Sequence, residues 1–207
     1  SAASDVYKRQ GDKSVVNKLI KDDRIKAVSF VGSTPVAKNI YETSAISGKR
    51  CQALGGAKNH ALILPDADID YTTDQLISAA YGSSGQRCMA LSVAVVFSDI
   101  KDEFIQDLER KVQKLKFGLD DLHSNSFGPL VSKEHLESVK NYIEMSEGEG
   151  ARVLIDGRDF LKRKNSNNGY FLGPTIIDNV SSNMKSYQNE IFGPVLQIME
   201  VNKLSDA

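Results

Sequence analysis

The chain has 207 residues, of which 41% are hydrophobic and 26% are charged, and its formal net charge is −1. This composition is ordinary for a globular domain and lacks the basic excess that nucleic-acid-binding proteins show. Two cysteines and three histidines supply neither a disulfide framework nor a metal-binding spacing, and no apolar run is long enough to cross a bilayer, so we expect no metal, nucleic-acid or membrane partner.

The N-terminal quarter predicts a helix, a strand and a second helix. Residues 1–10 differ in character from the rest of the chain, and we expect them to be a non-native leader. Apolar residues at helical spacing predict an amphipathic helix over Ser14–Asp23, and a buried strand comes next over Ala27–Val31. Thr34 is a suitable N-cap for the next helix, which Gly48 ends. The predicted apolar face of that helix consists of Val36, Ile40 and Tyr41.

Strands and helices continue to alternate as far as Val201, which predicts an α/β fold with a parallel sheet. The predicted elements are the strand His60–Leu64, the helix Tyr71–Tyr81, the strand Leu91–Phe97, a helix over 101–116, the helix Lys133–Ser146 and the strand Arg152–Ile155. The helix over 101–116 has the clearest apolar face, formed by Phe104, Ile105, Leu108, Val112 and Leu115. A polar surface loop is predicted at Arg163–Gly169.

The stretch FVGSTPVA, Phe30–Ala37, ends a strand in Gly-Ser-Thr at the start of a helix. The first N–H groups of a helix are unpaired, so such a turn suits a phosphate. The stretch lacks both standard phosphate-binding glycine patterns, and by itself it is more often an ordinary strand-to-helix turn.

Two further stretches contain glycines beside polar residues. QALGGAKNH, Gln52–His60, places Gly55 and Gly56 where backbone can approach a ligand closely, although a simple loop is the alternative. NEIFGPVL, Asn189–Leu196, places Glu190 before an aromatic-Gly-Pro turn. Glu190 can accept hydrogen bonds from sugar hydroxyls, as acidic residues do for a nucleotide ribose, or it is a solvated residue before a strand.

The stretch GSSGQRCMALS, Gly82–Ser92, contains one of the two cysteines. Cys88 follows a flexible Gly/Ser approach and a neighbouring cation, Arg87, which favours an accessible thiolate. A cysteine before an apolar strand is otherwise a buried packing residue. Cys51 has no such approach, so we interpret it as structural.

Taken together and in this order, FVGSTPVA, ALGGAKN, GQRC and EIFGPV resemble four successive signatures of the aldehyde dehydrogenase superfamily. The resemblance extends from about Ser14 to Val201. Within the superfamily, QALGGAKNH and GQRCMALS are similar to the CoA-acylating branch. The resemblance implies an aldehyde-dehydrogenase-like α/β fold, with the end of a Rossmann-type NAD-binding domain at 11–52 and most of a catalytic domain, truncated at its C-terminus, at 53–207.

The resemblance also implies roles for individual residues. Cys88 is expected to be the nucleophile that attacks the aldehyde and carries the acyl group as a thioester. Ser33 matches the contact to the cofactor phosphate, and Gly55 matches the backbone position beside the nicotinamide. Glu190 matches the glutamate that binds the ribose, and Phe192 matches the aromatic residue packed near the nicotinamide.

One departure from the family pattern bears on the acyl acceptor. Hydrolytic members have a glutamate just before Leu-Gly-Gly as the general base for water, whereas this chain has Leu54 there or, one residue earlier, Ala53. Neither side chain can accept a proton. The implied reaction therefore uses NAD and CoA to convert methylmalonate or malonate semialdehyde to propanoyl-CoA or acetyl-CoA and CO2. Arg87 is a candidate for recognising the substrate carboxylate, unless it stabilises its own loop.

Two other functions remain as alternatives. One is an ordinary hydrolytic aldehyde dehydrogenase, and the other is an inactive, truncated α/β fragment. The parent protein is expected to be a homo-oligomer, a tetramer, that acts on a small aldehyde. We expect it in the cytoplasm, or in the mitochondrial matrix of a eukaryote, because the cysteine usage fits a reducing compartment.

Overall fold

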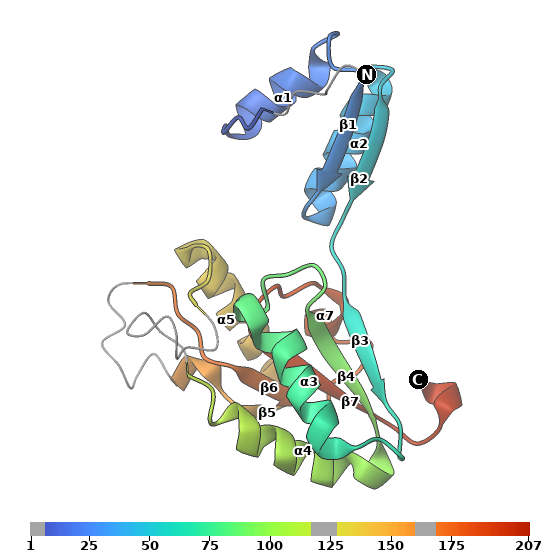
Figure 1. Ribbon diagram of the computed structural model, residues 1–207, viewed down its shortest axis with the longest axis vertical. Helices are drawn as coiled ribbons and strands as arrows, with labels where there is room; N and C mark the ends of the chain where they lie inside the picture. The colour runs from blue at the N-terminus through green and yellow to red at the C-terminus, as the bar shows by residue number, and fades with distance from the viewer. Residues whose placement is uncertain (1–6, 117–127, 160–168) are drawn as a thin grey trace. The chain divides into compact units, whose positions relative to one another are not determined.

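The computed structural model describes residues 7–116, 128–159 and 169–207. The chain forms two compact units, one ending at Gly56 and the other beginning at Ala57 (Figure 1). The domain boundary that we expect from the sequence lies slightly earlier, between Gln52 and Ala53.

The first unit contains two helices and a two-stranded parallel sheet. Its elements are α1 (Lys13–Lys21), β1 (Ala27–Val31), α2 (Thr34–Ile46) and β2 (Arg50–Leu54). The register of the sheet runs from Ala27 opposite Arg50 to Val31 opposite Leu54. The sequence pattern does not predict β2, because Arg-Cys-Gln-Ala-Leu has no β-branched residue. Pairing with β1 gives this segment its extended form.

The start of α2 lies one residue earlier than the N-cap prediction allows. Ser33, and not Thr34, is the N-cap residue, so that Thr34 is the first helical residue. On the predicted apolar face, Ile40 is buried, whereas Val36 and Tyr41 are exposed. Small residues therefore contribute more to the buried side of this helix than the hydrophobic pattern predicts.

The second unit is built on a five-stranded sheet in the order β3-β4-β7-β6-β5. Its strands are β3 (Asn59–Ile63), β4 (Leu91–Phe97), β5 (Arg152–Ile155), β6 (Thr175–Asp178) and β7 (Val195–Val201). The pairs β3–β4, β4–β7 and β7–β6 are parallel, and β5 joins β6 as an antiparallel edge strand. The predicted α/β class with a parallel sheet is confirmed.

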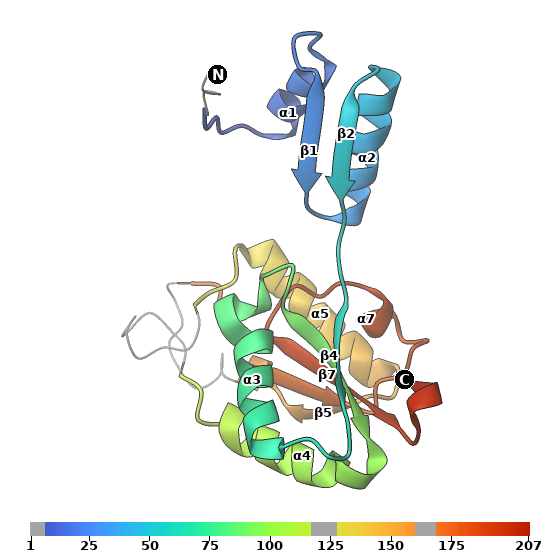
Figure 2. The same ribbon diagram turned by 45° about the vertical axis from the view of Figure 1, so that its right-hand side comes forward.

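Helices cover both faces of this sheet (Figures 1 and 2). The helices α3 (Ile69–Tyr81) and α4 (Ser98–Val112) lie on one face, and α5 (Lys133–Gly148) and the short α7 (Lys185–Gln188) lie on the other. The predicted apolar face of α4 is confirmed, with Phe104, Ile105, Leu108 and Val112 buried and Leu115 packed against them. The core on the other face contains Leu136, Val139, Ile143, Ile177, Met184, Ile191 and Val195.

Helix boundaries in this unit differ from the prediction by a few residues. α3 begins at Ile69 because the carboxylate of Asp68 accepts a hydrogen bond from the backbone N–H of Tyr71 and so caps the helix. α4 begins at Ser98, directly after β4. No helix in the described part of the chain combines the length and apolarity that a membrane span needs. The predicted loop lies outside the described residues apart from Gly169, and His123 lies outside them too.

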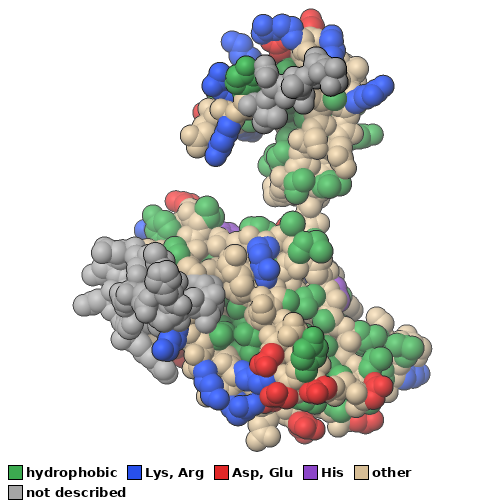
Figure 3. Space-filling model, viewed as in Figure 1, with side chains coloured by type: hydrophobic (Ala, Val, Ile, Leu, Met, Phe, Trp, Pro, Cys, Tyr) green, Lys and Arg blue, Asp and Glu red, His purple; other side chains and the backbone are tan. Residues whose placement is uncertain are grey.

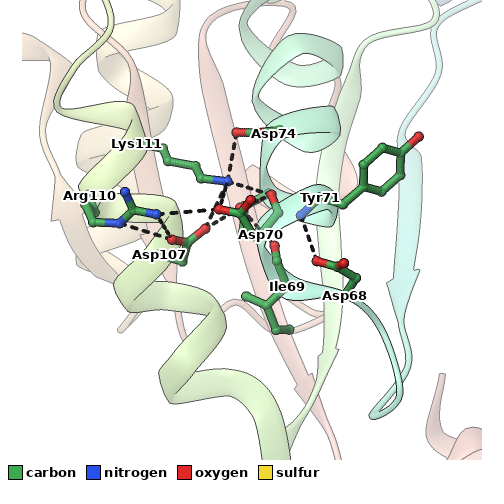
Figure 4. A network of polar contacts seen from close by, with 9 residues as sticks. Asp68, Ile69, Asp70, Tyr71, Asp74, Asp107, Arg110 and Lys111 are labelled. Atoms are coloured by element: carbon green, nitrogen blue, oxygen red, sulfur yellow. Dashed lines mark hydrogen bonds and ion pairs between the residues drawn. The ribbon is translucent and has the colours of Figure 1, made fainter.

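Charged side chains join α3 to α4 on the outer side of their layer. Figure 3 shows acidic and basic side chains gathered over these helices, and Figure 4 shows the network they form. The Nζ atom of Lys111 lies 2.9 Å from Asp70 Oδ1, 2.8 Å from Asp74 Oδ1 and 3.2 Å from Asp107 Oδ2. Asp107 also accepts hydrogen bonds from Thr73 and Arg110. Because its two central side chains, Lys111 and Asp107, are 12% and 15% exposed, water screens them less than it screens an ordinary surface pair.

We expect Asp107 to make unfolding depend on pH. The hydrogen bond from Thr73, with those from Arg110 and Lys111, lowers the pKa of Asp107 to about 2. A carboxylate with a pKa depressed in the folded state stabilises the fold above its unfolded pKa and loses this effect as the pH falls toward 2. Asp107→Asn should lower the urea midpoint at pH 7, and its deficit relative to the parent should shrink between pH 5 and pH 3.

Circular dichroism during urea unfolding measures this difference. Asp102→Asn, an exposed carboxylate on the same helix, serves as the control. A deficit for Asp107→Asn that is constant with pH contradicts the assignment.

Candidate active site

The predicted site residues of the second unit lie in the segments that enter β4 and β7. Arg87 and Cys88 precede β4, while Glu190 and Phe192 precede β7. These two strands are parallel neighbours, so the segments that enter them meet at one edge of the sheet. A small pocket at this edge is lined by Arg87, Cys88, Glu190 and Phe192, together with Asn59 at the start of β3.

Left-handed backbone shapes the loop that leads to Cys88. Ser83, Ser84 and Gly85 have φ values of 51°, 58° and 67°, all in the region where side chains are disfavoured. Gly85 also approaches the other site segment, because a Cβ atom placed on it would overlap the carbonyl oxygen of Gly193. The small residues before Cys88 therefore allow the two site segments to contact each other through their backbones.

Polar side chains hold this loop against the segment that precedes α5. The hydroxyl of Ser84 donates to the carbonyl of Gly128. The side-chain amide of Gln86 donates to Pro129 O at 3.3 Å and accepts from the backbone N–H of Val131 at 2.9 Å. Gln86 therefore satisfies one backbone acceptor and one backbone donor of that segment.

Arg87 binds the end of α3. Its Nε donates to Gly82 O at 3.1 Å, and its Nη2 donates to Ser78 O at 3.1 Å and to Ala79 O at 2.7 Å. Ser78 and Ala79 lie in the last turn of α3, and Gly82 is its C-cap residue, whose own N–H donates to the carbonyl of Ser78. The contacts favour the alternative in which Arg87 stabilises its own loop.

The side chain of Cys88 is exposed, whereas that of Cys51 is half-buried. Asn59 holds the backbone from Cys88 to Ala90, because its Nδ2 donates to Cys88 O at 2.8 Å and to Ala90 O at 2.9 Å. Sequence reasoning did not single out Asn59, although it lies within the ALGGAKN stretch. The sequence signal that could identify Asn59 is its place at the end of this stretch, directly before a predicted strand.

The segment before β7 holds Phe192 in a strained conformation. Phe192 has a φ of 55° and is 38% exposed, while Glu190 is half-buried. Nε2 of His135, on α5, lies 2.7 Å from the carbonyl oxygen of Phe192, and the two rings meet edge to face at 6.3 Å. Because a carbonyl only accepts, Nε2 of His135 carries the proton. The sequence prediction gave His135 no role.

Ser33 and Gly55 lie in the first unit, where the structure brings their two motifs together. The hydroxyl of Thr34 accepts a hydrogen bond from the backbone N–H of Gly56 at 3.0 Å. A Cβ atom on Gly55 would lie 2.8 Å from that hydroxyl oxygen, so this position requires glycine. The side chain of Ser33 makes no capping bond to α2.

Comparison with known proteins gives matches along almost the whole chain. The profile of the aldehyde dehydrogenase family matches residues 8–207. The chain is 47% identical over 198 residues to malonate-semialdehyde dehydrogenase 1 of Oceanobacillus iheyensis, covering 95% of this chain and 40% of that protein.

Solved structures agree with the sequence matches. The crystal structure of methylmalonate-semialdehyde dehydrogenase from Oceanimonas doudoroffii matches with a TM-score of 0.90 and 53% identity, covering 95% of this chain and 40% of that one. A betaine aldehyde dehydrogenase from Staphylococcus aureus in complex with NAD+ matches with a TM-score of 0.85 and 32% identity, covering 93% and 38%. The chain thus spans about 40% of the length of the curated relatives it matches.

Gly85→Ala should disrupt the contact between the two site segments. The added methyl group meets the carbonyl of Gly193, and left-handed backbone costs a non-glycine residue roughly 1–3 kcal/mol. We expect a loss of more than about 2 kcal/mol in the free energy of unfolding.

Gly150→Ala provides the matched control in the same unit. Gly150 also has a positive φ, 97°, but among the described residues no atom lies within 4 Å of the position that its Cβ atom would take. Chemical unfolding of both variants separates backbone strain from the clash, and equal losses argue against a close approach at Gly85.

Proposed function

Because the chain belongs to the aldehyde dehydrogenase family, we propose that the complete gene product oxidises an aldehyde with NAD+ and uses Cys88 as its nucleophile. The observation that carries this proposal is the small pocket in which an exposed Cys88 lies with Glu190 and Phe192. A thiol at the entrance to β4 is accessible to a small aldehyde, and Asn59 holds the backbone from Cys88 to Ala90.

The chemistry of Cys88 follows from its position. The thiolate attacks the aldehyde carbon, and the carbonyl oxygen becomes an oxyanion that the backbone N–H of Cys88 can stabilise. NAD+, when bound, would supply the acceptor for the hydride that this carbon loses. Cys88 then holds the acyl group as a thioester until an acceptor nucleophile removes it, which restores the thiol.

From the family resemblance we propose cofactor contacts in each of the two units. The hydroxyl of Ser33 and the first N–H groups of α2 suit a phosphate, and Gly55, which packs closely against Thr34 and carries no side chain, suits a backbone contact to the nicotinamide. The carboxylate of Glu190 suits ribose hydroxyls, and the exposed ring of Phe192 suits a flat, apolar face of the nicotinamide.

We further propose that CoA is the acyl acceptor. Ala53 and Leu54 end β2 directly before Gly55. Whichever of the two matches the position of the hydrolytic base, the side chain there is apolar. A CoA thiolate needs no such base, since it is a far better nucleophile than water near neutral pH. The relatives named malonate-semialdehyde and methylmalonate-semialdehyde dehydrogenase support these two semialdehydes as substrates.

The expected products are acetyl-CoA or propanoyl-CoA with CO2. A thioester carbonyl β to a carboxylate accepts the electron pair released when CO2 leaves, and a proton then replaces CO2 on that carbon. Arg87 remains a candidate contact for the substrate carboxylate, although its three bonds to the end of α3 and its C-cap favour the loop-stabilising role. From the family resemblance we also propose a homo-oligomer that acts in the cytoplasm, or in the mitochondrial matrix of a eukaryote.

Two alternatives are retained. A hydrolytic aldehyde dehydrogenase requires a base other than the side chains at 53 and 54. A chain without catalytic activity is the second alternative, because this chain spans about 40% of the length of its relatives.

Cys88 should react faster than Cys51 with an alkylating reagent. Cys88 is exposed on a held loop, whereas Cys51 lies half-buried in β2. Brief treatment with iodoacetamide followed by peptide mass spectrometry measures both sites. Faster labelling of Cys51 contradicts the assignment of the nucleophile.

The acyl acceptor can be tested with the complete gene product. With methylmalonate semialdehyde and NAD+ alone, we expect a burst of NADH near one equivalent per site, then slow turnover, because general-base assistance is worth roughly 10²–10⁴-fold. Added CoA should restore steady turnover and yield a thioester. Leu54→Glu should raise CoA-independent hydrolysis, and Ala53→Glu tests the neighbouring position. Rapid steady turnover to free acid without CoA leaves the hydrolytic alternative standing.

A further inference from the structure

The segment at the start of β3 contacts both site loops. Asn59 binds the backbone around Cys88 through its side-chain amide. Lys58, one residue earlier, turns to the other loop, where its Nζ donates to Ser186 O at 3.0 Å and to Asn189 O at 2.9 Å. Consecutive residues therefore hold the segments that precede β4 and β7.

The environment of Lys58 differs from that of a solvated lysine. Burial lowers its pKa to about 8, and the nearby charge of Glu190 opposes this shift. A desolvated ammonium group needs its hydrogen-bond acceptors, and the two carbonyls supply them. One of these carbonyls belongs to Asn189, which is covalently joined to Glu190, so the position of Lys58 fixes the backbone from which the Glu190 carboxylate extends.

His60, in β3, contacts both Lys58 and Tyr187 of α7. Its Nδ1 lies 2.8 Å from Lys58 O, so this nitrogen donates, and its Nε2 accepts from the hydroxyl of Tyr187 at 2.8 Å. The pairing register of β3 with β4 shifts between Asn59 and His60, which marks an irregularity in the strand pairing at this point.

We propose that Lys58 and Asn59 are positioning residues with separate targets. Lys58 sets the position of Glu190 and hence the affinity for the cofactor, whereas Asn59 sets the position of Cys88 and hence the reactivity of its thiol. This inference rests on the proposed roles of Cys88 and Glu190.

The two loops have further anchors, which is why the effects are separable. Gln86 and Arg87 still hold the Cys88 loop when Lys58 is changed. Glu149 accepts from the backbone N–H of Lys185 at 2.8 Å, so the start of α7 remains fixed. The loss of Lys58 therefore loosens chiefly the segment that carries Asn189 and Glu190.

Three substitutions test the inference by a crossed design. Lys58→Met keeps the aliphatic stem without a donor, Lys58→Arg keeps the donors, and Asn59→Asp keeps the shape but loses the Nδ2 donor. Three quantities are measured for each variant. They are the hydrogen exchange of peptides over 186–191 and 86–90, the alkylation rate of Cys88, and the KM for NAD+ of the complete gene product.

Lys58→Met should speed exchange over 186–191 and raise the KM for NAD+ by about tenfold, as expected from the loss of hydrogen bonds by a charged group. It should change kcat by less than about threefold and leave Cys88 alkylation unaltered. Asn59→Asp should show the opposite pattern. It should alter exchange over 86–90 and Cys88 alkylation, and leave exchange over 186–191 and the KM for NAD+ unaltered. Lys58→Arg should recover most of the cofactor affinity.

The inference is overturned if both variants alter both loops equally, or if neither alters its own loop. Should Lys58→Met fail to fold, Lys58→Gln, with a shorter neutral donor, answers the same question. If the parent protein does not reduce NAD+, the proposed function fails, while exchange and alkylation still decide whether Lys58 and Asn59 act on separate loops.

Discussion

The parallel hydrogen bonds that pair β3 with β4 and β4 with β7 determine where the candidate site lies. In a parallel sheet every strand starts at the same edge, so the segments that enter these three neighbours converge. Cys88, Glu190 and Asn59 are distant in sequence, yet each lies in one of these entering segments. If β7 were not the direct neighbour of β4, Cys88 and Glu190 would not share a pocket. The glycines and hydrogen bonds of the loops refine an arrangement that the strand order has already set.

Much of the fold and the family could be predicted from the sequence, because the signals are local. The apolar run of β4 and the periodicity of α4 identify these elements without reference to the rest of the chain. The α/β class and the aldehyde dehydrogenase family follow from the alternation of elements and from four ordered motifs. β2 escaped prediction because its extended form depends on pairing with β1, and Arg-Cys-Gln-Ala-Leu carries little strand preference of its own.

The supporting contacts of the candidate site could not be predicted, because they join residues far apart in the chain. Lys58 binds the carbonyl of Asn189 across 131 positions, and His135 binds that of Phe192 across 57. A lysine before a strand and a histidine in the first turn of a helix carry no sign of these partners. The motif around Cys88 identifies the thiol, whereas the left-handed turn at Ser83 and Ser84 and the approach to Gly193 emerge only from the fold.

The bonds from Arg87 to α3 have an electrostatic consequence for Cys88, the proposed nucleophile. Because the strands start at this edge, α3 ends here, and the carbonyl end of a helix carries roughly half a negative charge. A thiolate beside that end is disfavoured, as is a carboxylate on the aldehyde. The guanidinium donates to Ser78, Ala79 and Gly82, so a positive charge covers the carbonyl oxygens where the chain turns toward Cys88. Arg87 thereby replaces a repulsive surface with a cation at the place where the proposed reaction gathers negative charge.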